Sequence, residues 1–276
     1  MTAQTEHGSS EYRFDDLRTR DIVADMYYRS TDPAPGDRIP AFDLPTLAGT
    51  RFASEDLGDR PVLLVFGSQT CPVTRSALPP LNELHTHYGD RVRFVLVQTR
   101  EAHPGELLPQ PRTDEEKAAH AASMRDDLHV TYEVAVDDID GTLHRAVGPK
   151  PNSAYLLRPD GIIDARVHWA NDTAAVRASV EGALSTHSVR TRRGRMVVPL
   201  LTAVGHLPDV VRRAGGKAER DVWKAAPPLA LLGRASTLLR GLATDRRGPT
   251  AALGLTILAL AALATVLALA GGVPTT

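Results

Sequence analysis

The sequence predicts an α/β fold in which a mixed β-sheet is flanked by helices. Residues 62–66 and 92–97 are short, wholly apolar runs, as expected of parallel strands buried on both faces. Between them, residues 74–88 carry leucines at helical spacing. Residues 154–157 and 162–169 have the pattern of two further strands, joined by an Arg-Pro-Asp-Gly segment that is typical of a hairpin turn. A strand–helix–strand unit followed by a hairpin predicts a mixed sheet with an antiparallel pair at its edge.

Other segments complete this pattern. Residues 113–128 predict a helix, residues 134–136 a short strand and residues 141–147 a short helix. Residues 173–184 predict the closing helix of the domain. Ahead of the domain, residues 11–28 mix apolar with charged side chains, which is typical of an amphipathic helix.

Composition divides the chain into four parts. We expect an N-terminal helical extension over residues 1–37, the α/β domain over 38–186, a basic and partly amphipathic linker over 187–249, and a transmembrane helix over 250–271. Residues 190–249 hold 13 Lys/Arg and four Asp/Glu, a net charge of +9, whereas the 189 residues before them carry −10. An acidic body followed by a basic tail predicts contact with an anionic surface such as membrane lipid.

The C-terminal region predicts attachment to a membrane. Residues 251–270 contain no charge, Pro, Asn or Gln, and as a helix they would measure about 30 Å, the thickness of a bilayer's hydrocarbon core. We expect a single span here, because no other part of the chain is suited to surround such a helix. Residues 229–242 precede it with Arg234 and Arg240 among leucines, a pattern that fits an interfacial helix and a solvated linker equally well.

Charges beside the span predict its orientation. Arg246 and Arg247 precede it, and residues 271–276 contain no Lys or Arg, so the positive-inside rule puts the α/β domain on the cytoplasmic side. The polar, acidic N-terminus has no apolar run of the kind found in secretory signals. A single cysteine also favours a reducing compartment.

Cys71 is the candidate catalytic residue. It directly follows the first predicted strand of the domain and precedes its first helix, where unpaired N–H groups and the helix dipole stabilise an anion. Thr74 offers a hydroxyl and Arg75 a positive charge close by. A buried structural cysteine is the alternative, but Pro72 and the polar neighbours favour a functional one. We therefore expect a reactive, partly accessible thiol with a lowered pKa.

Two motifs give the chain a resemblance to a known family. They follow the first two strands of the domain, with the sequences Phe66-Gly67-Ser68-x-Thr70-Cys71-Pro72 and Glu101-Ala102-His103-Pro104. Together they resemble the iodothyronine deiodinases, in which selenocysteine stands at the place of Cys71. The resemblance implies a thioredoxin-like fold over roughly residues 38–185, with Cys71 as nucleophile and Glu101 and His103 as the charged and proton-handling residues beside it. The segment 36–50 also resembles the opening of peroxiredoxins.

The chain departs from the deiodinase pattern in three ways. Cysteine replaces selenocysteine, which lowers the expected nucleophilicity at neutral pH. Gln69 stands where some members carry a further cysteine, and Thr74 stands where a thioredoxin has its second cysteine, so dithiol exchange within the motif is excluded. Ser68 and Pro72, on either side of Cys71, also resemble the peroxiredoxin pattern.

Further residues are expected to support the cysteine. A thioredoxin-like site usually has a cis-proline facing the sulfur. Pro151 is the candidate for that position, and Asn152 could occupy it equally well, because the register is open by one residue. The supporting set is therefore Ser68, Thr70, Thr74, Arg75 and Pro151.

We expect a membrane-tethered, single-cysteine thiol oxidoreductase of the deiodinase-like type. Cys71 would attack an electrophile, and an external thiol, either thioredoxin or a low-molecular-weight thiol, would regenerate it. A peroxidase of the one-cysteine type and a non-enzymatic binding module with a redoxin fold are the alternatives. The sequence contains no metal-ligand spacing and no dinucleotide fingerprint, and its basic tail lacks the interleaved aromatic residues of a nucleic-acid platform. We therefore expect no bound cofactor or metal and no nucleic-acid partner.

Overall fold

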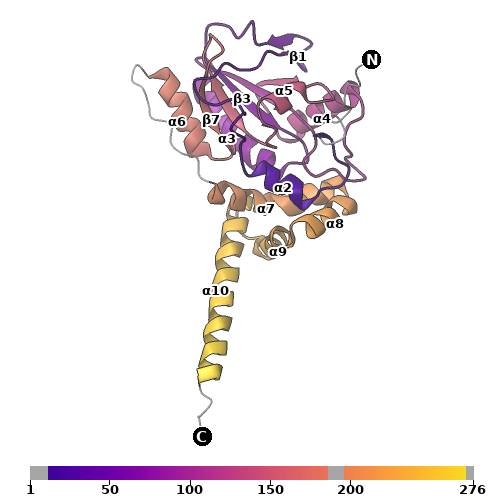
Figure 1. Cartoon of the computed structure of the whole chain (residues 1–276), viewed down its shortest axis with the longest axis vertical. Helices are drawn as coiled ribbons and strands as arrows, with labels where there is room; N and C mark the ends of the chain where they lie inside the picture. Colours follow the sequence, from indigo (N-terminus) through magenta and orange to yellow (C-terminus); the bar gives the residue numbers. More distant parts are fainter. Residues whose placement is uncertain (1–11, 186–195, 272–276) are drawn as a thin grey trace.

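The computed structural model describes residues 12–185 and 196–271, which form one body from which a single helix projects (Figure 1). In the body the elements are α2 (Thr19–Asp25), β1 (Asp43–Pro45), β2 (Arg51–Ala53), β3 (Val62–Gly67), α3 (Pro72–Tyr88), β4 (Arg93–Gln98), α4 (Asp114–Asp127), β5 (Glu133–Val136), α5 (Thr142–Ala146), β6 (Ala154–Leu157), β7 (Ile163–Val167) and α6 (Thr173–Leu184). The chain continues with α7 (Val197–Ala214), α8 (Gly216–Ala225), α9 (Pro227–Ser236), the 3₁₀ turn η1 (Thr237–Leu239) and α10 (Thr244–Gly271).

The central sheet has five strands in the order β5-β4-β3-β6-β7. Strands β3, β4 and β5 are parallel, whereas β6 and β7 are antiparallel. This confirms the predicted thioredoxin-like mixed sheet. Strands β3 and β4 end side by side, since Gly67 pairs with Gln98. The segments that follow them, which carry the two sequence motifs, therefore leave the sheet at the same edge.

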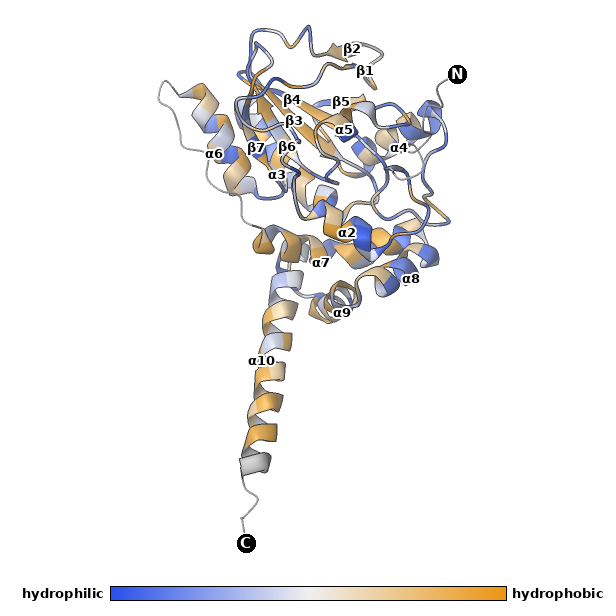
Figure 2. Ribbon diagram, viewed as in Figure 1, coloured by the Kyte–Doolittle hydropathy of each residue, from blue (hydrophilic) through white to orange (hydrophobic). Residues whose placement is uncertain are grey.

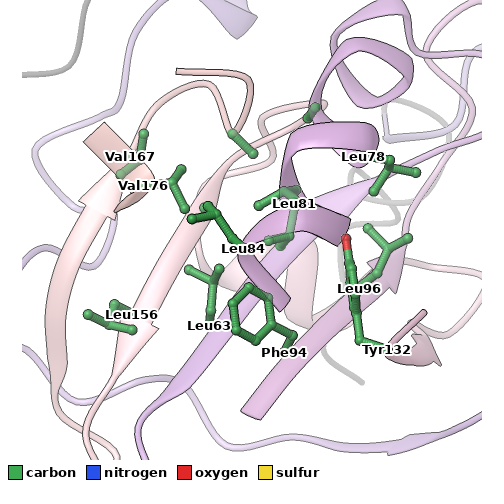
Figure 3. Close-up of a cluster of buried hydrophobic side chains, with 14 of the residues drawn as sticks. Leu63, Leu78, Leu81, Leu84, Phe94, Leu96, Tyr132, Leu156, Val167 and Val176 are labelled. Carbon is green, nitrogen blue, oxygen red and sulfur yellow. The ribbon is translucent and has the colours of Figure 1, made fainter. Parts of the chain in front are cut away.

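Side chains of β3 alternate between two apolar layers. Leu63 and Val65 belong to the layer shared with α3, α4 and α6, part of which is shown in Figure 3. Leu64 and Phe66 belong to the opposite layer, together with Leu143 of α5. All six residues of β3 are buried. Because both faces of the sheet are covered, the strand is apolar throughout instead of alternating.

The N-terminal extension is less helical than the sequence predicts. Helix α2 covers Thr19–Asp25 instead of the expected residues 11–28. The apolar side chains of this segment are buried at separate places: Tyr12 bonds His144 Nδ1 at 2.8 Å, whereas Leu17 packs with α7 and α8. Tertiary contacts of this kind override a helical pattern in the sequence.

Helices α7, α8 and α9 pack beneath the body where the sequence predicts a linker (Figure 1). Leu207, Val211 and Val222 of these helices form a buried cluster with Leu17 of the N-terminal extension. Gly215 and Pro227 mark the boundaries between α7, α8 and α9, and buried residues of all three helices pack together. This region therefore covers part of the body.

Helix α10 projects from the body, and most of its coloured outer part is hydrophobic (Figure 2). Within its segment Thr244–Leu267, an 18-residue window has a mean hydropathy of 2.2, and only 6% of that window is buried in the protein. Helix α10 is therefore long enough and apolar enough to cross a membrane. Its first turns meet α7 at Gly248 and Gly205, where a Cβ atom on either glycine would clash with the backbone of the facing helix. This close approach joins α10 to the helices beneath the body.

Candidate active site around Cys71

Cys71 is the N-cap residue of α3 at the end of β3. Its Sγ accepts a hydrogen bond from the Thr74 N–H at 3.4 Å. The Thr74 hydroxyl accepts from the Ser68 N–H at 3.3 Å and from Asn152 Nδ2 at 3.2 Å, so its own O–H is available to donate to Cys71. Pro72 takes the first helical position. A backbone N–H there would have no partner within the helix, so the N–H that proline lacks costs no helical hydrogen bond. The loop and the helix start thus direct several donors toward the sulfur.

Burial raises the pKa of the Cys71 thiol. The side chain is 1% exposed and packs with Val73, Trp169 and Ala203 of α7. Its pKa is raised from 9.0 to about 11, chiefly because burial disfavours the thiolate, although hydrogen bonds from Thr74 and from backbone N–H groups lower it. The expected accessible thiol with a lowered pKa is therefore wrong for this structure. The hydrogen bonds at the helix start lower the pKa of Cys71 as predicted, but the residues packed over the sulfur exclude water and raise that pKa by more.

Arg75 turns to other partners than the sulfur. Its Nη1 lies 2.7 Å from Asp127 of α4, and Asp127 also contacts Arg213 of α7 at 2.9 Å. The guanidinium that was expected to stabilise the Cys71 thiolate instead helps to join α3, α4 and α7.

Glu101 organises the segment before Cys71. Its Oε2 accepts hydrogen bonds from the Thr70 N–H at 2.8 Å and from the Thr70 hydroxyl at 2.6 Å. Its Oε1 accepts from Gln98 Nε2 at 3.1 Å and contacts His120 Nδ1 at 2.9 Å. The hydrogen bond to Glu101 raises the pKa of His120. A fully buried carboxylate is tolerated because donors surround both of its oxygens.

His103 lies at the cavity that contains Cys71. Its backbone N–H donates to Thr70 Oγ1 at 3.1 Å, which ties the second motif to the first. Its Nδ1 is buried and has no hydrogen-bond partner among the described residues. Burial lowers the pKa of His103 to about 4, against a smaller opposing effect of Glu101. The imidazole is therefore neutral near pH 7, and one ring nitrogen is able to take up a proton.

Asp25, at the end of α2, is a site residue that the sequence did not reveal. It lines the same cavity as Cys71 and His103. Its Oδ1 is buried without a hydrogen-bond partner in the described part of the chain and lies 3.6 Å from Arg100 Nη2. Burial raises the pKa of Asp25 to about 7, although Arg100 and Lys150 lower it. Only the fold brings this carboxyl to the cysteine, so no local pattern could have found it.

The backbone at the end of α2 is anchored to the domain. Lys150 Nζ donates to the Ala24 carbonyl at 2.9 Å, and His168 Nε2 bonds the Asp25 carbonyl at 2.8 Å. These contacts hold the Asp25 side chain at the cavity.

The cavity itself has a volume of about 80 Å³. Cys71, Asp25, His103 and Trp169 are its polar members, and Trp169 Nε1 is also buried without a partner among residues 12–185 and 196–271. The other walls are largely apolar and come from the N-terminal extension and the covering helices: Leu17, Ile22, Met26, Leu200, Ala203, Val204, Leu207, Val222 and Leu229. A single water needs roughly 10–15 Å³ of such space, so the cavity has room for a small reactant.

The expected cis-proline is not found. Every peptide bond of the described chain is trans, including the one before Pro151, whose ring lines the cavity. Asn152, the alternative candidate, faces the cysteine loop instead. Its Nδ2 donates to the Phe66 carbonyl at 2.9 Å, and its Oδ1 accepts from the Ala170 N–H at 3.2 Å. The amide thus joins β3 to the segments on either side of the β6–β7 hairpin.

Comparisons with known proteins agree with this geometry. Residues 35–166 match the AhpC/TSA family. The chain is 31% identical over 128 residues to the thioredoxin-like protein YneN of Bacillus subtilis, covering 46% of this chain and 68% of that protein. It is 26% identical over 115 residues to thyroxine 5-deiodinase of Sparus aurata, covering 38% of this chain and 43% of that protein. The likeness to the deiodinase therefore extends over less than half of its length.

Solved structures of similar proteins include two from Mycobacterium tuberculosis. Peroxidoxin BcpB is 17% identical with a TM-score of 0.44, over 56% of this chain and 99% of that chain. A secreted disulfide oxidoreductase homologous to E. coli DsbE is 20% identical with a TM-score of 0.41, over 51% of this chain and 95% of that chain. On the family match, the similarity to YneN and the sheet described above, the chain belongs to the AhpC/TSA family of redoxins.

Proposed function

We propose that this protein is a membrane-tethered thiol oxidoreductase in which Cys71 is the only redox-active thiol. The observation that carries the proposal is the cavity that Cys71 shares with Asp25 and His103, because Asp25 Oδ1 and His103 Nδ1 have no hydrogen-bond partner among the described residues. A thiol with a raised pKa needs a base to become a nucleophile. A structural cysteine in an apolar core would need neither group.

The reaction begins with transfer of the thiol proton. Asp25 in its ionised form accepts the Cys71 proton, because its pKa of about 7 suits a base at neutral pH better than the pKa of about 4 of His103. The Cys71 sulfur then attacks the electrophilic atom of the substrate. With a hydroperoxide, the sulfur bonds to the distal oxygen, the O–O bond breaks, and the stored proton goes to the departing alkoxide. The products are the Cys71 sulfenic acid and an alcohol, so sulfur is oxidised and the peroxide is reduced by two electrons.

Regeneration requires a second molecule. The chain contains one cysteine, so no internal disulfide forms. An external thiol, thioredoxin or a low-molecular-weight thiol, condenses with the sulfenic acid and releases water. A second thiol then attacks the outer sulfur of this mixed disulfide, which restores the Cys71 thiol.

Two substrate classes are supported by specific observations. The AhpC/TSA match over residues 35–166 and the Ser68-x-x-Cys71 spacing favour a hydroperoxide. The combination of the Cys71 motif with Glu101-Ala102-His103-Pro104 favours an iodinated aromatic compound. The Cys71 sulfur would then bond to iodine while the carbon–iodine bond breaks and the ring carbon takes up the proton. The external thiol would reduce the resulting sulfenyl iodide, releasing iodide. Sulfur is less nucleophilic than selenium, which weakens the case for removing iodine from an aromatic ring. The hydroperoxide is therefore the first candidate.

The covering helices control access in this proposal. Ala203 of α7 packs against Cys71, and the segment around Gly105 and Leu107 contacts the end of α7 at Ala214. A reactant larger than the cavity therefore reaches the sulfur when one of its walls, α7 or the N-terminal extension, moves away. The same movement would hydrate the thiol and lower its pKa.

We also propose that α10 crosses the membrane with the redox domain on the cytoplasmic side. Support comes from the apolar window of α10 and from Arg246 and Arg247 in its first turns. Protease added to intact cells should leave the domain whole. If the protease digests the domain while a cytosolic control protein survives, the domain lies on the outer side of the membrane and the proposed orientation is wrong.

The catalytic proposal is tested by trapping the product at Cys71. Full-length protein is exposed separately to cumene hydroperoxide, an iodinated phenol and a small disulfide, and the thiol is then analysed by mass spectrometry. We expect the sulfenic acid with the hydroperoxide, its reversal by added thiol, and no reaction in Cys71→Ser. If Cys71 stays unmodified with all three reagents, yet reacts once the protein is unfolded, the proposal is wrong.

A further inference from the structure

A second cavity, separate from the cysteine site, lies among α7, α8, α9 and η1. Its volume is about 170 Å³. The floor is apolar and buried, and Val211, Val222 and Ala230 form part of it. Three arginines, Arg212, Arg234 and Arg240, line its exposed side, and we call it the arginine cavity.

The arginine cavity has unbalanced positive charge. Arg212 pairs with Asp209 at 2.5 Å. The guanidinium groups of Arg234 and Arg240 have neither an ion pair nor a side-chain hydrogen bond to any described residue. Glu219 is the single acidic residue that lines the cavity, against three arginines. A pocket with two unpaired guanidinium groups has the chemistry of an anion site, because these groups bind the oxygens of phosphate with paired hydrogen bonds.

The position of the cavity indicates where the anion comes from. Arg234 is in α9 and Arg240 follows η1, just before the apolar helix α10 begins. Helix α9 contacts α10 and lies beside the start of that helix in Figure 1, whereas α8 contacts α9. Leu238 and Leu242, in the same segment, are 85% and 38% exposed. Exposed leucines next to arginines at the beginning of a span are typical of the membrane–water interface.

We propose that the arginine cavity binds the phosphate headgroup of an anionic membrane lipid. The phosphate lies between Arg234 and Arg240, and the acyl chains extend past Leu238 along α10. Trp223, which lines the cavity and is 40% exposed, contacts the glycerol region. The proposal rests on the membrane attachment proposed above, but it is independent of the chemistry at Cys71.

Fluorescence of Trp223 provides the test. The full-length protein carries two tryptophans, so a Trp169→Phe background in nonionic detergent leaves Trp223 as the reporter. The probes are dihexanoyl phosphatidylglycerol, dihexanoyl phosphatidylcholine and inorganic phosphate. We expect saturable binding of the phosphatidylglycerol and at least tenfold weaker binding of the other two, because only the first combines a net negative phosphate with acyl chains.

Variants assign the binding to the cavity. Arg234→Gln with Arg240→Gln should weaken phosphatidylglycerol binding at least tenfold. Arg246→Gln, an equally exposed arginine in α10 outside the cavity, is the matched control and should change it less than twofold. Native mass spectrometry of the purified protein should show co-purified anionic lipid that the double variant loses.

Three results would overturn the proposal. Equal binding of phosphatidylcholine would remove the role of charge, and equal binding of inorganic phosphate would identify a free-phosphate site. An Arg246→Gln effect as large as that of the double variant would indicate a diffuse basic surface. Cys71 trapping on protein that keeps Trp169 distinguishes the two proposals, because Trp169 packs against Cys71. Lipid binding by protein whose Cys71 is unreactive refutes only the catalytic proposal.

Discussion

Replacing Asp25 with asparagine tests the most unexpected feature of the cysteine site. The Asp25 side chain is 18% exposed, and burial raises its pKa from 3.8 to about 7. The folded protein therefore holds a proton on Asp25 between about pH 4 and pH 7 that the unfolded chain has released. The contribution of Asp25 to the unfolding free energy is fully present below pH 3.8 and is lost as the pH rises through 7.

The size of this effect follows from the two pKa values. The interval from 3.8 to about 7, at 1.36 kcal/mol for each pH unit, corresponds to about 4 kcal/mol of unfolding free energy. Asparagine cannot titrate, so Asp25→Asn should resemble the wild type near pH 4 and exceed it by about 4 kcal/mol at pH 8. The pKa of His103, lowered to about 4 by burial, has the opposite effect on stability: it makes the protein more stable as the pH rises from 4 to 6.5. That contribution is common to both proteins and cancels in their difference.

Urea unfolding of the full-length protein in detergent, followed by tryptophan fluorescence at several pH values, measures this difference. Asp90→Asn is the matched control, because the Asp90 side chain is 80% exposed. It should shift the unfolding free energy by no more than about 0.5 kcal/mol at any pH. A difference between Asp25→Asn and wild type that stays constant from pH 4 to pH 8 would refute the assignment of a buried, protonated Asp25.

Three further predictions concern the cysteine and the groups that surround it. Thr74→Val leaves two donors, Ser68 N–H and Asn152 Nδ2, without their acceptor and should lower the unfolding free energy by about 2–4 kcal/mol, whereas Thr74→Ser should retain most of it; chemical denaturation distinguishes the two. Glu101→Gln replaces one carboxylate oxygen by an amide group that donates hydrogen bonds, whereas both Thr70 groups that contact Glu101 are donors. We expect the unfolding free energy to fall by about 2–3 kcal/mol and Cys71 oxidation to slow; an unchanged melting temperature would contradict this. Because the Cys71 pKa is raised from 9.0 to about 11, its thiolate fraction at pH 7.5 is roughly 100-fold below that of an unperturbed thiol, and alkylation by iodoacetamide should accelerate steeply above pH 9; a plateau below pH 8 would show that the cover is open in solution.

Local pattern was enough to predict the sheet and the place of the cysteine. Strand β3 is wholly apolar because both of its faces are buried, and this signal is complete within six residues. Cys71 follows this strand and caps α3, so its position at a helix start could also be predicted. The pairing of Gly67 with Gln98 then brings the Glu101 motif to the same edge, as parallel strands require. The apolar window of α10 is likewise a property of composition alone.

Tertiary structure alone decided the chemical state of that cysteine. The pKa of Cys71 depends on how much water reaches the sulfur, and that is set by Trp169 and by Ala203 of α7, far away in the sequence. Asp25 becomes a site residue only because the N-terminal extension is anchored across the domain. Helix starts and strand periodicity arise from neighbouring residues and are written in the sequence. Desolvation sums over every element packed against a group, so it is defined only once the chain has folded.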